Sequence, residues 1–353
     1  MMEHLKDIRI GERPIGSGHP CFIIAEAGVN HNGDMALARE LVHAAKECGA
    51  DAVKFQTFKA ERVTTPHAPK AAYQLIVTDP GESQFDMLKK LELSEAAHKE
   101  LLSLAGSLGL VFLSTPYGSD DASMLDRLGL SAFKVASGQI VELSFLEFVA
   151  RLGKPIILST GMSSLEEVKQ AVTTIRNAGN GQVILLQTTT NYPAHPDEAN
   201  LLAMDTMARA CSVNVGYSDH TPGMAVALAA VARGACVVEK HFTLDRSLPG
   251  PDQQCSADPA ELAELVRGIR QVEAALGDGR KRPSVSELSN LTGMRRSIVA
   301  AVDIPPGRTL TPEMLSFKRP GTGISPARLE EIIGRKTAVI IPRDTLLSFD
   351  QLQ

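Results

Sequence analysis

The chain is predicted to fold as an α/β protein, a (β/α)₈ barrel of the TIM type followed by a small β-rich domain. Three observations predict this fold. Between about residues 21 and 276, short apolar runs alternate with segments of helical periodicity. This βα unit occurs eight times, the number that closes into a barrel. Beyond residue 276 the pattern changes to short β-rich runs separated by turns that contain proline and glycine.

Each predicted strand is a short apolar run that leads into polar residues. The strands are Phe22–Ala25, Ala52–Phe55, Leu110–Leu113, Ala132–Val135, Pro155–Leu158, Val183–Leu186, Val213–Tyr217 and Cys236–Glu239. Segments such as Asp34–Cys48, which lie between the strands, are predicted to be helices. One helix start is predicted at Ser163, where Glu166 has the spacing of a capping box. Helix ends are indicated by glycines, which adopt the left-handed conformation at least cost. These are Gly49, Gly109, Gly129, Gly153 and Gly179.

The sequence predicts two domains joined by a linker. We assign residues 1–276 to the barrel, 277–293 to the linker and 294–353 to the second domain. The linker begins with glycines and charged residues and then reaches a proline, a composition typical of loops. In the second domain we expect strands over Ser297–Val302 and Thr337–Ile341. A domain of this size has a thin core, so we expect it to pack against its own barrel or that of a second subunit.

The composition is typical of a soluble cytoplasmic protein. Among 353 residues, 44% are hydrophobic and 22% are charged. The net charge of −5 excludes a generally basic surface for nucleic acid or membrane. Five cysteines without C-x-x-C spacing favour free thiols in a reducing compartment. The N-terminal Met1–Asp7 is charged where a signal peptide needs an apolar run, and no apolar stretch reaches membrane-spanning length.

Two histidines follow the last two predicted strands of the barrel. His220 comes after Ser218-Asp219, and His241 comes after Glu239-Lys240. Parallel strands joined by a helical crossover bring both rings to the same edge of the sheet, where barrels carry their chemistry. Either histidine alone is more typical of a turn or a local hydrogen bond. Together they predict a shared divalent ion that acts as a Lewis acid, such as Mn²⁺, Mg²⁺, Zn²⁺ or Fe²⁺.

Polar residues at the other strand ends predict an anionic substrate. Lys54 and Lys134 lie on separate strands and are candidates for binding phosphate and carboxylate groups. Glu26 ends the first strand and is the candidate for proton transfer, a role worth roughly 10²–10⁴-fold in rate. Hydroxyl groups at the same edge come from Thr115, Ser137 and Ser218.

These strand ends form motifs that resemble the sialic acid synthase family. The barrel motifs are Ile24–Asp34 (IAEAGVNHNGD), Lys54–Thr57 (KFQT), Leu113–Pro116 (LSTP), Phe133–Gly138 (FKVASG), Leu158–Met162 (LSTGM), Gly216–Thr221 (GYSDHT) and Glu239–Thr243 (EKHFT). Arg295–Ile298 (RRSI) and Lys318–Gly323 (KRPGTG) resemble the antifreeze-like SAF domain of that family. The stretch Lys54–Glu61 is more similar to N-acetylneuraminate and legionaminate synthases than to the pseudaminate branch.

The resemblance implies a reaction between phosphoenolpyruvate and an open-chain N-acylated hexosamine. The sugar is N-acetylmannosamine or a 2,4-diacetamido-trideoxyhexose, and the products are a nonulosonic acid and phosphate. The implied cofactor is Mn²⁺, with Mg²⁺ as the alternative, held by His220 and His241. The residues implied to bind phosphoenolpyruvate are Lys54, Thr115, Lys134, Ser137, Thr190 and Ser218, and those implied to bind the sugar are Gln56, Tyr192 and Asp252.

The resemblance also implies a domain-swapped homodimer. In this arrangement, Arg319 of one SAF domain holds the N-acyl group of the sugar in the neighbouring barrel. Two positions depart from the family pattern. Gln139 stands where many relatives have glutamate, which leaves Glu26 as the candidate for proton transfer, and Thr190 stands where some members have asparagine.

Three other functions remain open from the sequence. Lys54 or Lys134 could form a Schiff base with pyruvate in an aldolase. The chain could be another phosphoenolpyruvate-dependent 3-deoxy-ulosonate synthase. It could also be a silent sugar-binding protein, with Gln139 as the sign of lost chemistry. The presence of both histidines, both lysines and Glu26 favours a synthase.

Overall fold

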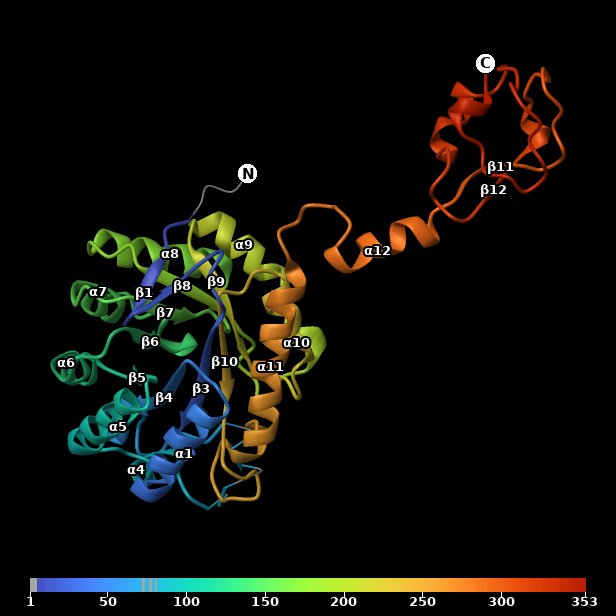
Figure 1. Ribbon diagram of the computed structural model, residues 1–353. Coiled ribbons are helices and arrows are strands. Elements are labelled where there is room, and N and C mark those ends of the chain that lie inside the picture. The colour runs from blue at the N-terminus through green and yellow to red at the C-terminus, as the bar shows by residue number, and fades with distance from the viewer. Residues whose placement is uncertain (1–4, 72–73, 76–77, 80) are drawn as a thin grey trace. The chain divides into compact units, whose positions relative to one another are not determined.

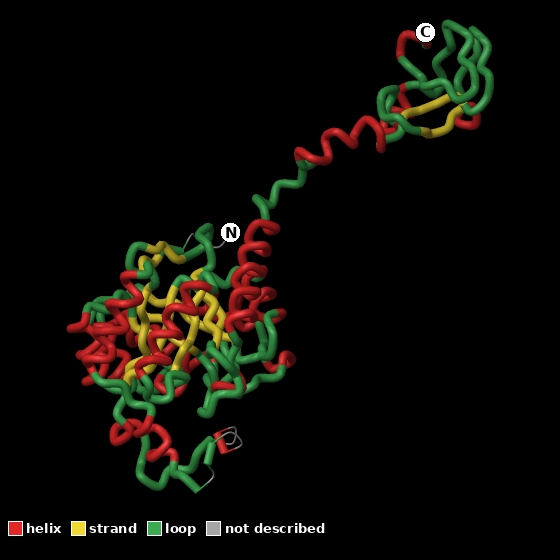
Figure 2. Tube along the Cα trace, turned by 60° about the horizontal axis from the view of Figure 1, so that its bottom comes forward, coloured by secondary structure: helices red, strands yellow, loops and turns green. Residues whose placement is uncertain are grey.

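A computed structural model describes residues 5–71, 74–75, 78–79 and 81–353. The chain divides into two compact units, Met1–Gly277 and Asp278–Gln353. In the first unit, parallel strands form an inner sheet that helices surround, which confirms the predicted barrel (Figures 1 and 2). No described helix combines the length and the apolar character that crossing a membrane requires.

The barrel strands all run in the same direction. They are β3 (Phe22–Gly28), β4 (Ala52–Thr57), β5 (Val111–Pro116), β6 (Phe133–Val135), β7 (Ile156–Ser159), β8 (Val183–Gln187), β9 (Asn214–Asp219) and β10 (Val237–His241). Their spatial order is β5-β4-β3-β10-β9-β8-β7-β6, and β5 also lies next to β6, so the sheet nearly closes. The register places Glu26 opposite Lys54 on β4 and opposite His241 on β10. Polar residues of neighbouring strands are thereby brought to one level of the barrel.

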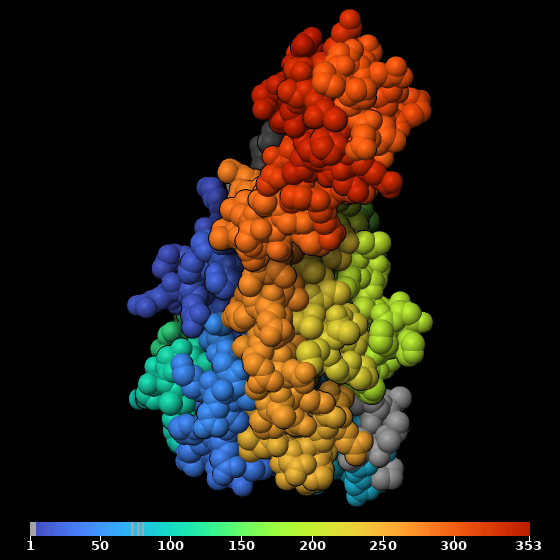
Figure 3. Space-filling model, turned by 45° about the vertical axis from the view of Figure 1, so that its right-hand side comes forward, coloured from blue at the N-terminus to red at the C-terminus, as the bar shows by residue number. Residues whose placement is uncertain are grey.

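Helices and short helical turns connect the strands. In the first unit they are α1 (Met35–Glu47), α2 (Ala60–Val63), α4 (Gln84–Lys90), α5 (Glu95–Ser107), α6 (Ser119–Leu128), α7 (Leu143–Arg151), α8 (Leu165–Asn177), α9 (Leu202–Cys211), α10 (Ala225–Ala232) and α11 (Pro259–Leu276). The last of these, α11, lies along the outer surface of this unit (Figure 3). All five glycines predicted to end helices have positive φ. The predicted start of α8 is wrong by one residue, because the capping box is formed by Ser164 and Glu167.

The barrel interior is apolar at the N-terminal ends of the strands. Ile24, Leu113 and Val237 belong to one buried cluster there, which also includes Ile10 and Ile15. These two isoleucines come from a hairpin of β1 (Ile8–Ile10) and β2 (Arg13–Ile15) that the sequence analysis did not predict. Since side chains two residues apart in a strand share a face, the polar residues that follow this cluster also point into the barrel.

The second unit is built around an antiparallel pair of short strands. It contains α12 (Val285–Met294), β11 (Ser297–Ala300) and β12 (Leu315–Lys318). Its buried cluster includes Ile298, Ile304, Leu310, Ile332, Ile341 and Leu347. All but the last residue of α12 lies in the segment 277–293, which we expected to be a linker. The strand predicted over Thr337–Ile341 is wrong, since this segment makes only isolated bridges, and Pro342 directly after it has no N–H to extend a ladder.

Replacing Gly216 by alanine should destabilise the barrel. A Cβ atom at this position in β9 would overlap the Val237 carbonyl oxygen and lie 2.7 Å from Leu186 Cδ2. We expect Gly216→Ala to lower the free energy of unfolding by about 1–3 kcal/mol, because the adjacent strands must move apart. In α5, Gly106→Ala is the control, since nothing lies within 4 Å of the added Cβ, and alanine should stabilise by up to about 1 kcal/mol. Urea unfolding compares the two; equal stability of Gly216→Ala and wild type would contradict the packing argument.

Candidate active site

A cavity of about 490 Å³ opens at the C-terminal ends of the barrel strands. Every residue that the sequence analysis assigned to the site lines this cavity, except Arg319. These residues are Glu26, Lys54, Gln56, Thr115, Lys134, Ser137, Thr190, Tyr192, Ser218, His220, His241 and Asp252. Arg319 belongs to the second unit, where its Nε donates a hydrogen bond to the Met294 carbonyl oxygen at 3.2 Å.

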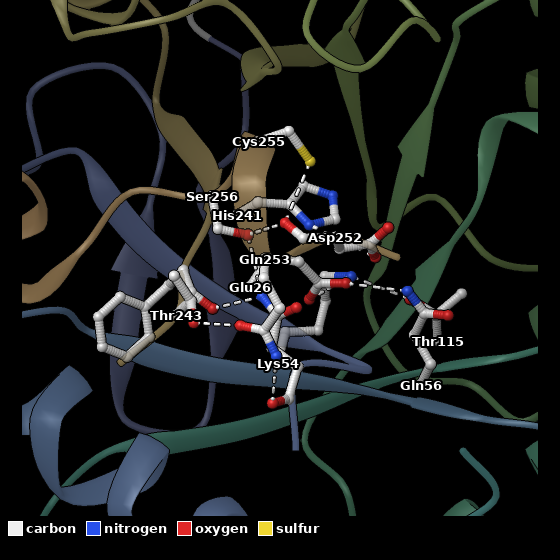
Figure 4. A network of polar contacts seen from close by, with 12 residues as sticks. Glu26, Lys54, Gln56, Thr115, His241, Thr243, Asp252, Gln253, Cys255 and Ser256 are labelled. Carbon is white, nitrogen blue, oxygen red and sulfur yellow. Dashed lines mark hydrogen bonds and ion pairs between the residues drawn. The ribbon is translucent and has the colours of Figure 1, made fainter. Parts of the chain in front are cut away.

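Four buried charged side chains form one group in the cavity. Lys54 Nζ lies 2.7 Å from Glu26 Oε2 and 3.7 Å from Glu239 Oε1. Lys134 Nζ lies 3.5 Å from the same Glu239 oxygen. Lys54 also donates a hydrogen bond to Thr115 Oγ1 at 3.1 Å, and Figure 4 shows it with Glu26 and Thr115. Glu239 was not among the predicted site residues, although its position two residues before His241 places it on the same face of the strand.

Burial and mutual charge shift the pKa values of these four groups. Burial raises the pKa of Glu26 to about 7, and the Lys54 ammonium offsets only part of this effect. Burial also acts to raise the pKa of Glu239, but Lys134 and Lys54 lower it below its usual value. Burial lowers the pKa of Lys134, whereas for Lys54 the two carboxylates outweigh burial and raise the pKa. Glu26 is therefore the carboxyl group suited to exchange a proton near neutral pH.

His220 and His241 lie together in the cavity with ring centroids 5.4 Å apart. His220 Nδ1 is 2.7 Å from the Thr189 carbonyl oxygen. Because a carbonyl only accepts, Nδ1 carries the proton and Nε2 has a free lone pair. Burial lowers the pKa of His220 to about 4 and that of His241 well below its usual value. Both rings are therefore neutral at physiological pH, as metal ligands must be.

The donor set fits a divalent ion held by two imidazoles. His241 Nδ1 is buried and has no hydrogen-bond partner among the described residues; the nearest carboxylate oxygen, Asp252 Oδ2, lies 3.9 Å away. Within the described part of the chain, no group of three or more His, Cys, Asp and Glu side chains is arranged to hold a metal. Two protein ligands leave coordination positions for water and substrate. The ring of Tyr192 packs against both imidazoles, with centroids at 4.2 and 5.5 Å.

A buried ion pair connects the ends of the two strands that carry the histidines. Lys240 Nζ lies 2.8 Å from Asp219 Oδ2 and donates to two carbonyl oxygens of the loop 221–223 at 2.5 and 3.0 Å. Asp219 Oδ1 accepts hydrogen bonds from Thr221 N at 2.9 Å and Thr221 Oγ1 at 2.7 Å. These residues adjoin His220 and His241 in the chain. The ion pair therefore fixes the backbone on either side of His220 relative to β10.

The loop after β10 brings Asp252 into the cavity. Ser256 Oγ donates a hydrogen bond to the Asp252 carbonyl oxygen at 2.6 Å and accepts one from Asn30 Nδ2 at 2.9 Å. Gln253 Nε2 donates to the Asn30 carbonyl oxygen at 2.9 Å. Figure 4 shows Asp252, Gln253 and Ser256 of this network beside His241. The bonds to Asn30 anchor the loop against the segment that follows β3.

Neutral polar groups from the turn after β6, from β7 and from the segment after β8 complete the lining of the cavity. Both side-chain amide atoms of Gln139 and the hydroxyls of Ser159 and Thr190 are buried without a hydrogen-bond partner among the described residues. Gly161 N donates to Ser137 Oγ at 2.9 Å, and a Cβ at Gly161 would overlap the Thr190 hydroxyl. Buried unpaired polar atoms that face a cavity are typical of groups that bond a ligand. Ser159 and Gln139 were not among the predicted site residues.

Two family models match the chain. The NeuB family model matches residues 41–281, and the SAF domain model matches residues 295–353. The chain belongs to the NeuB family. It is a sialic-type acid synthase family enzyme with a C-terminal SAF domain. NeuB-family enzymes generally use a divalent metal ion, in agreement with the two neutral imidazoles of the cavity.

Relatives match this NeuB-family chain along most of its length. N,N'-diacetyllegionaminic acid synthase from Legionella pneumophila is 46% identical over 347 residues, which cover 97% of this chain and 98% of that protein. The synthase of the same name from Campylobacter jejuni is 47% identical over 328 residues, covering 92% and 98%. A crystal structure of N-acetylneuraminic acid (sialic acid) synthetase from Leptospira borgpetersenii in complex with citrate matches with a TM-score of 0.73 and 34% identity, covering 81% of this chain and 95% of that chain.

Removing the Lys240 ammonium should weaken metal binding. Lys240→Met leaves the buried Asp219 carboxylate without its partner, so we expect a loss of about 3–5 kcal/mol in the free energy of unfolding. Displacement of the His220 loop should lower Mn²⁺ affinity by about 10–100-fold, measured by electron paramagnetic resonance. The control is Lys154→Met, which removes a partly exposed pair with Asp126 at 2.6 Å. It should cost at most about 1 kcal/mol and leave Mn²⁺ binding unchanged. A folded Lys240→Met variant with wild-type Mn²⁺ affinity would disprove the positioning role.

Proposed function

We propose that this NeuB-family enzyme condenses phosphoenolpyruvate with an open-chain N-acylated hexosamine, releasing phosphate and forming a nonulosonic acid. One observation carries the proposal. A single cavity contains two buried ammonium groups, two neutral imidazoles and a carboxyl group with a pKa near 7. Relatives named for legionaminic acid and N-acetylneuraminic acid support this class of product.

Phosphoenolpyruvate binds at the lysine residues of the cavity. Lys54 and Lys134 supply the ammonium groups for its phosphate and carboxylate. When Glu26 is protonated, these two ammonium groups face only the Glu239 carboxylate within the charged group, so the site carries an excess positive charge for an anion. Hydroxyl groups that supply further hydrogen bonds come from Thr115, Ser137, Thr190 and Ser218.

The sugar binds with its aldehyde beside His220 and His241. These two residues hold the divalent ion, for which we propose Mn²⁺, with Mg²⁺ as the alternative. When bound, the ion supplies Lewis-acid polarisation of the aldehyde oxygen. Gln56, Tyr192 and Asp252 line the same cavity and bind the sugar. Gln56 Nε2 donates to Glu26 Oε1 at 3.3 Å, so the group that transfers protons lies next to a sugar-binding amide.

The residues determine where bonds form and where protons move. C3 of the enol phosphate attacks the aldehyde carbon, and the aldehyde oxygen takes up a proton to become a hydroxyl. Water then adds at C2 before phosphate leaves. Glu26 moves the proton in these steps, because a carboxyl group with a pKa of about 7 can both donate and accept near neutral pH. Gln139 cannot share this role, since an amide does not titrate, and it contributes hydrogen bonds instead.

We infer that the SAF domain of one subunit completes the barrel of another. Arg319 is exposed in its own unit and is available to hold the N-acyl group of a sugar in a neighbouring barrel. The connecting helix α12 exposes Val285, Leu288 and Met294, with 87%, 53% and 57% of each residue accessible. Val285 and Leu288 lie one turn apart on the same face of α12, and such exposed apolar side chains indicate a surface that packs against a partner, which favours a domain-swapped homodimer.

The purified enzyme should release phosphate from phosphoenolpyruvate when an N-acylated hexosamine is added. A chelator should abolish this activity and Mn²⁺ should restore it, because two neutral imidazoles bind an ion that exchanges readily. Mn²⁺ should not rescue His220→Ala or His241→Ala. The control is His195→Ala, at a histidine whose side chain is 74% exposed and that does not line the cavity. It should retain wild-type activity. Phosphate release without sugar, or full activity in chelator, would reject the proposal.

Mixing two impaired variants should restore part of the activity at a low sugar concentration if the homodimer is swapped. Glu26→Gln keeps the shape of the side chain but should lower turnover by roughly 10²–10⁴-fold, with a smaller effect on the KM for phosphoenolpyruvate. Arg319→Ala should raise the KM for the sugar. In the mixed dimer, one barrel has an intact Glu26 and receives an intact Arg319 from the partner. Recovered phosphate release measures this complete site.

The control for this mixing experiment combines Glu26→Gln with a chain that carries both substitutions. No barrel in that mixture has an intact Glu26, so no activity should return. If heterodimers of the two single variants form but no activity returns, Arg319 does not act across the dimer.

A further inference from the structure

One part of the active-site cavity is apolar. Six of the residues that line the cavity belong to a single packed cluster, which we call the apolar subsite. They are Val29, Phe58, Met87, Leu88, Leu91 and Tyr117. They come from the segments that follow β3, β4 and β5 and from α4 and its C-terminal residue. The apolar subsite is not used by any step of the proposed reaction.

The apolar subsite adjoins the sugar-binding residues. Tyr117 Oη donates a hydrogen bond to Gln56 Oε1 at 3.4 Å, and Gln56 Nε2 donates to Glu26 Oε1 at 3.3 Å. The ring of Phe58 meets that of Tyr117 edge to face, with centroids 5.8 Å apart and an interplanar angle of 79°. Contacts thus run without interruption from Glu26 to Phe58. A sugar held by Gln56 would therefore have the apolar subsite beside it.

The apolar subsite should favour methyl groups over hydroxyls on the carbons of the sugar. Its aliphatic and Phe58 side chains offer no hydrogen-bond partner to a hydroxyl, so a hydroxyl buried against them loses its bonds to water without replacement. The amides of Gln74 and Gln84, which also line the cavity, bond each other at 3.5 Å, and Gln84 Oε1 accepts from Thr64 at 3.0 Å. Methyl groups in the same place remove apolar surface from water on both sides of the contact. The far end of the sugar is therefore expected to carry methyl groups rather than hydroxyls.

We propose that the apolar subsite selects an acceptor that is a 6-deoxyhexose with acylamino groups at C2 and C4. Such a sugar presents the C6 methyl and the methyl of the second acyl group, where N-acetylmannosamine presents hydroxyls. This inference rests on the proposed function and specifies its sugar. It agrees with two relatives, 46% and 47% identical, whose names specify a diacetylated product.

Two substitutions on α4 change the polarity of the apolar subsite. Met87→Gln replaces an unbranched side chain by one of the same length and similar helix propensity, so the wall becomes polar with little change in volume. Leu88→Gln acts at a neighbouring position that is only half-buried and therefore tolerates a polar group. The matched control is Phe85→Gln, at a half-buried residue of the same helix that does not line the cavity.

The test compares two acceptors in the phosphate-release assay with saturating phosphoenolpyruvate. One is 2,4-diacetamido-2,4,6-trideoxymannose and the other is N-acetylmannosamine. In wild type we expect kcat/KM to be about tenfold or more higher for the first, the factor that a methyl group in an apolar pocket supplies. Met87→Gln and Leu88→Gln should each reduce this ratio about tenfold, whereas Phe85→Gln should not change it. The KM for phosphoenolpyruvate should stay the same in all three variants.

The outcomes separate this inference from the proposed function. A wild-type preference for N-acetylmannosamine would overturn the inference and leave the proposed function standing. The same holds if Met87→Gln and Leu88→Gln have the melting temperature of wild type and leave the ratio of the two kcat/KM values unchanged. Saturation-transfer NMR on wild type adds a test that needs no variant. The protons of the C6 methyl and of the acyl methyl at C4 should receive the strongest saturation, and weaker saturation there than on the ring protons would also overturn it. Absence of phosphate release with either acceptor would overturn the proposed function itself.

Discussion

Burying two ammonium and two carboxylate groups in a barrel costs several kcal/mol per ion unless opposite charges face each other. Lys54 lies between Glu26 and Glu239, and Lys134 faces Glu239, so each charge has a partner. The pairing depends on strand register, because a slip of one residue would turn a strand's charged side chains out of the barrel. The same register directs His241, at the end of β10, toward these charged groups.

Much of the barrel could be predicted because its strands alternate regularly and each leads into polar residues. The same regularity placed Glu26, Lys54, Lys134 and both histidines in one cavity, since inward-facing positions at the C-terminal strand ends converge there, whereas Tyr192 and Asp252 were expected only from the family resemblance. The sequence pattern did not predict elements that are very short, and it misplaced a helix start where two serines fitted the same capping pattern. The strands β1 and β2 have three residues each, too few to show a period. At the start of α8, Ser163 and Ser164 both precede a glutamate by three residues, and only the structure distinguishes them.

The sequence pattern alone could not predict contacts between residues that lie far apart in the chain. The position of Glu239, two residues before His241, indicates that both side chains share a face of the strand. Its pairing with Lys54 and Lys134, which come from two other strands, could not be predicted in this way. Lys240 also depends on distant partners, since its ammonium bonds the loop that follows His220. The apolar subsite brings Val29 into the same cluster as Tyr117, which lies far along the chain, and the periodicity of the sequence does not predict this contact. Arg319 lies in a separate unit, so its role in a barrel stays a prediction.

The helix α4 lies outside the alternation of strand and helix that builds the barrel, since it falls between α2 and α5 within a single connection. It nevertheless supplies Met87 and Leu88 to the cavity. Mutations in this helix can alter the cavity wall while the charged group on the strands keeps its register. Under the role we propose for the apolar subsite, selection can adjust the accepted sugar independently of the bond-forming chemistry. For the same reason, α4 is a natural segment to randomise when new nine-carbon sugar acids are the goal.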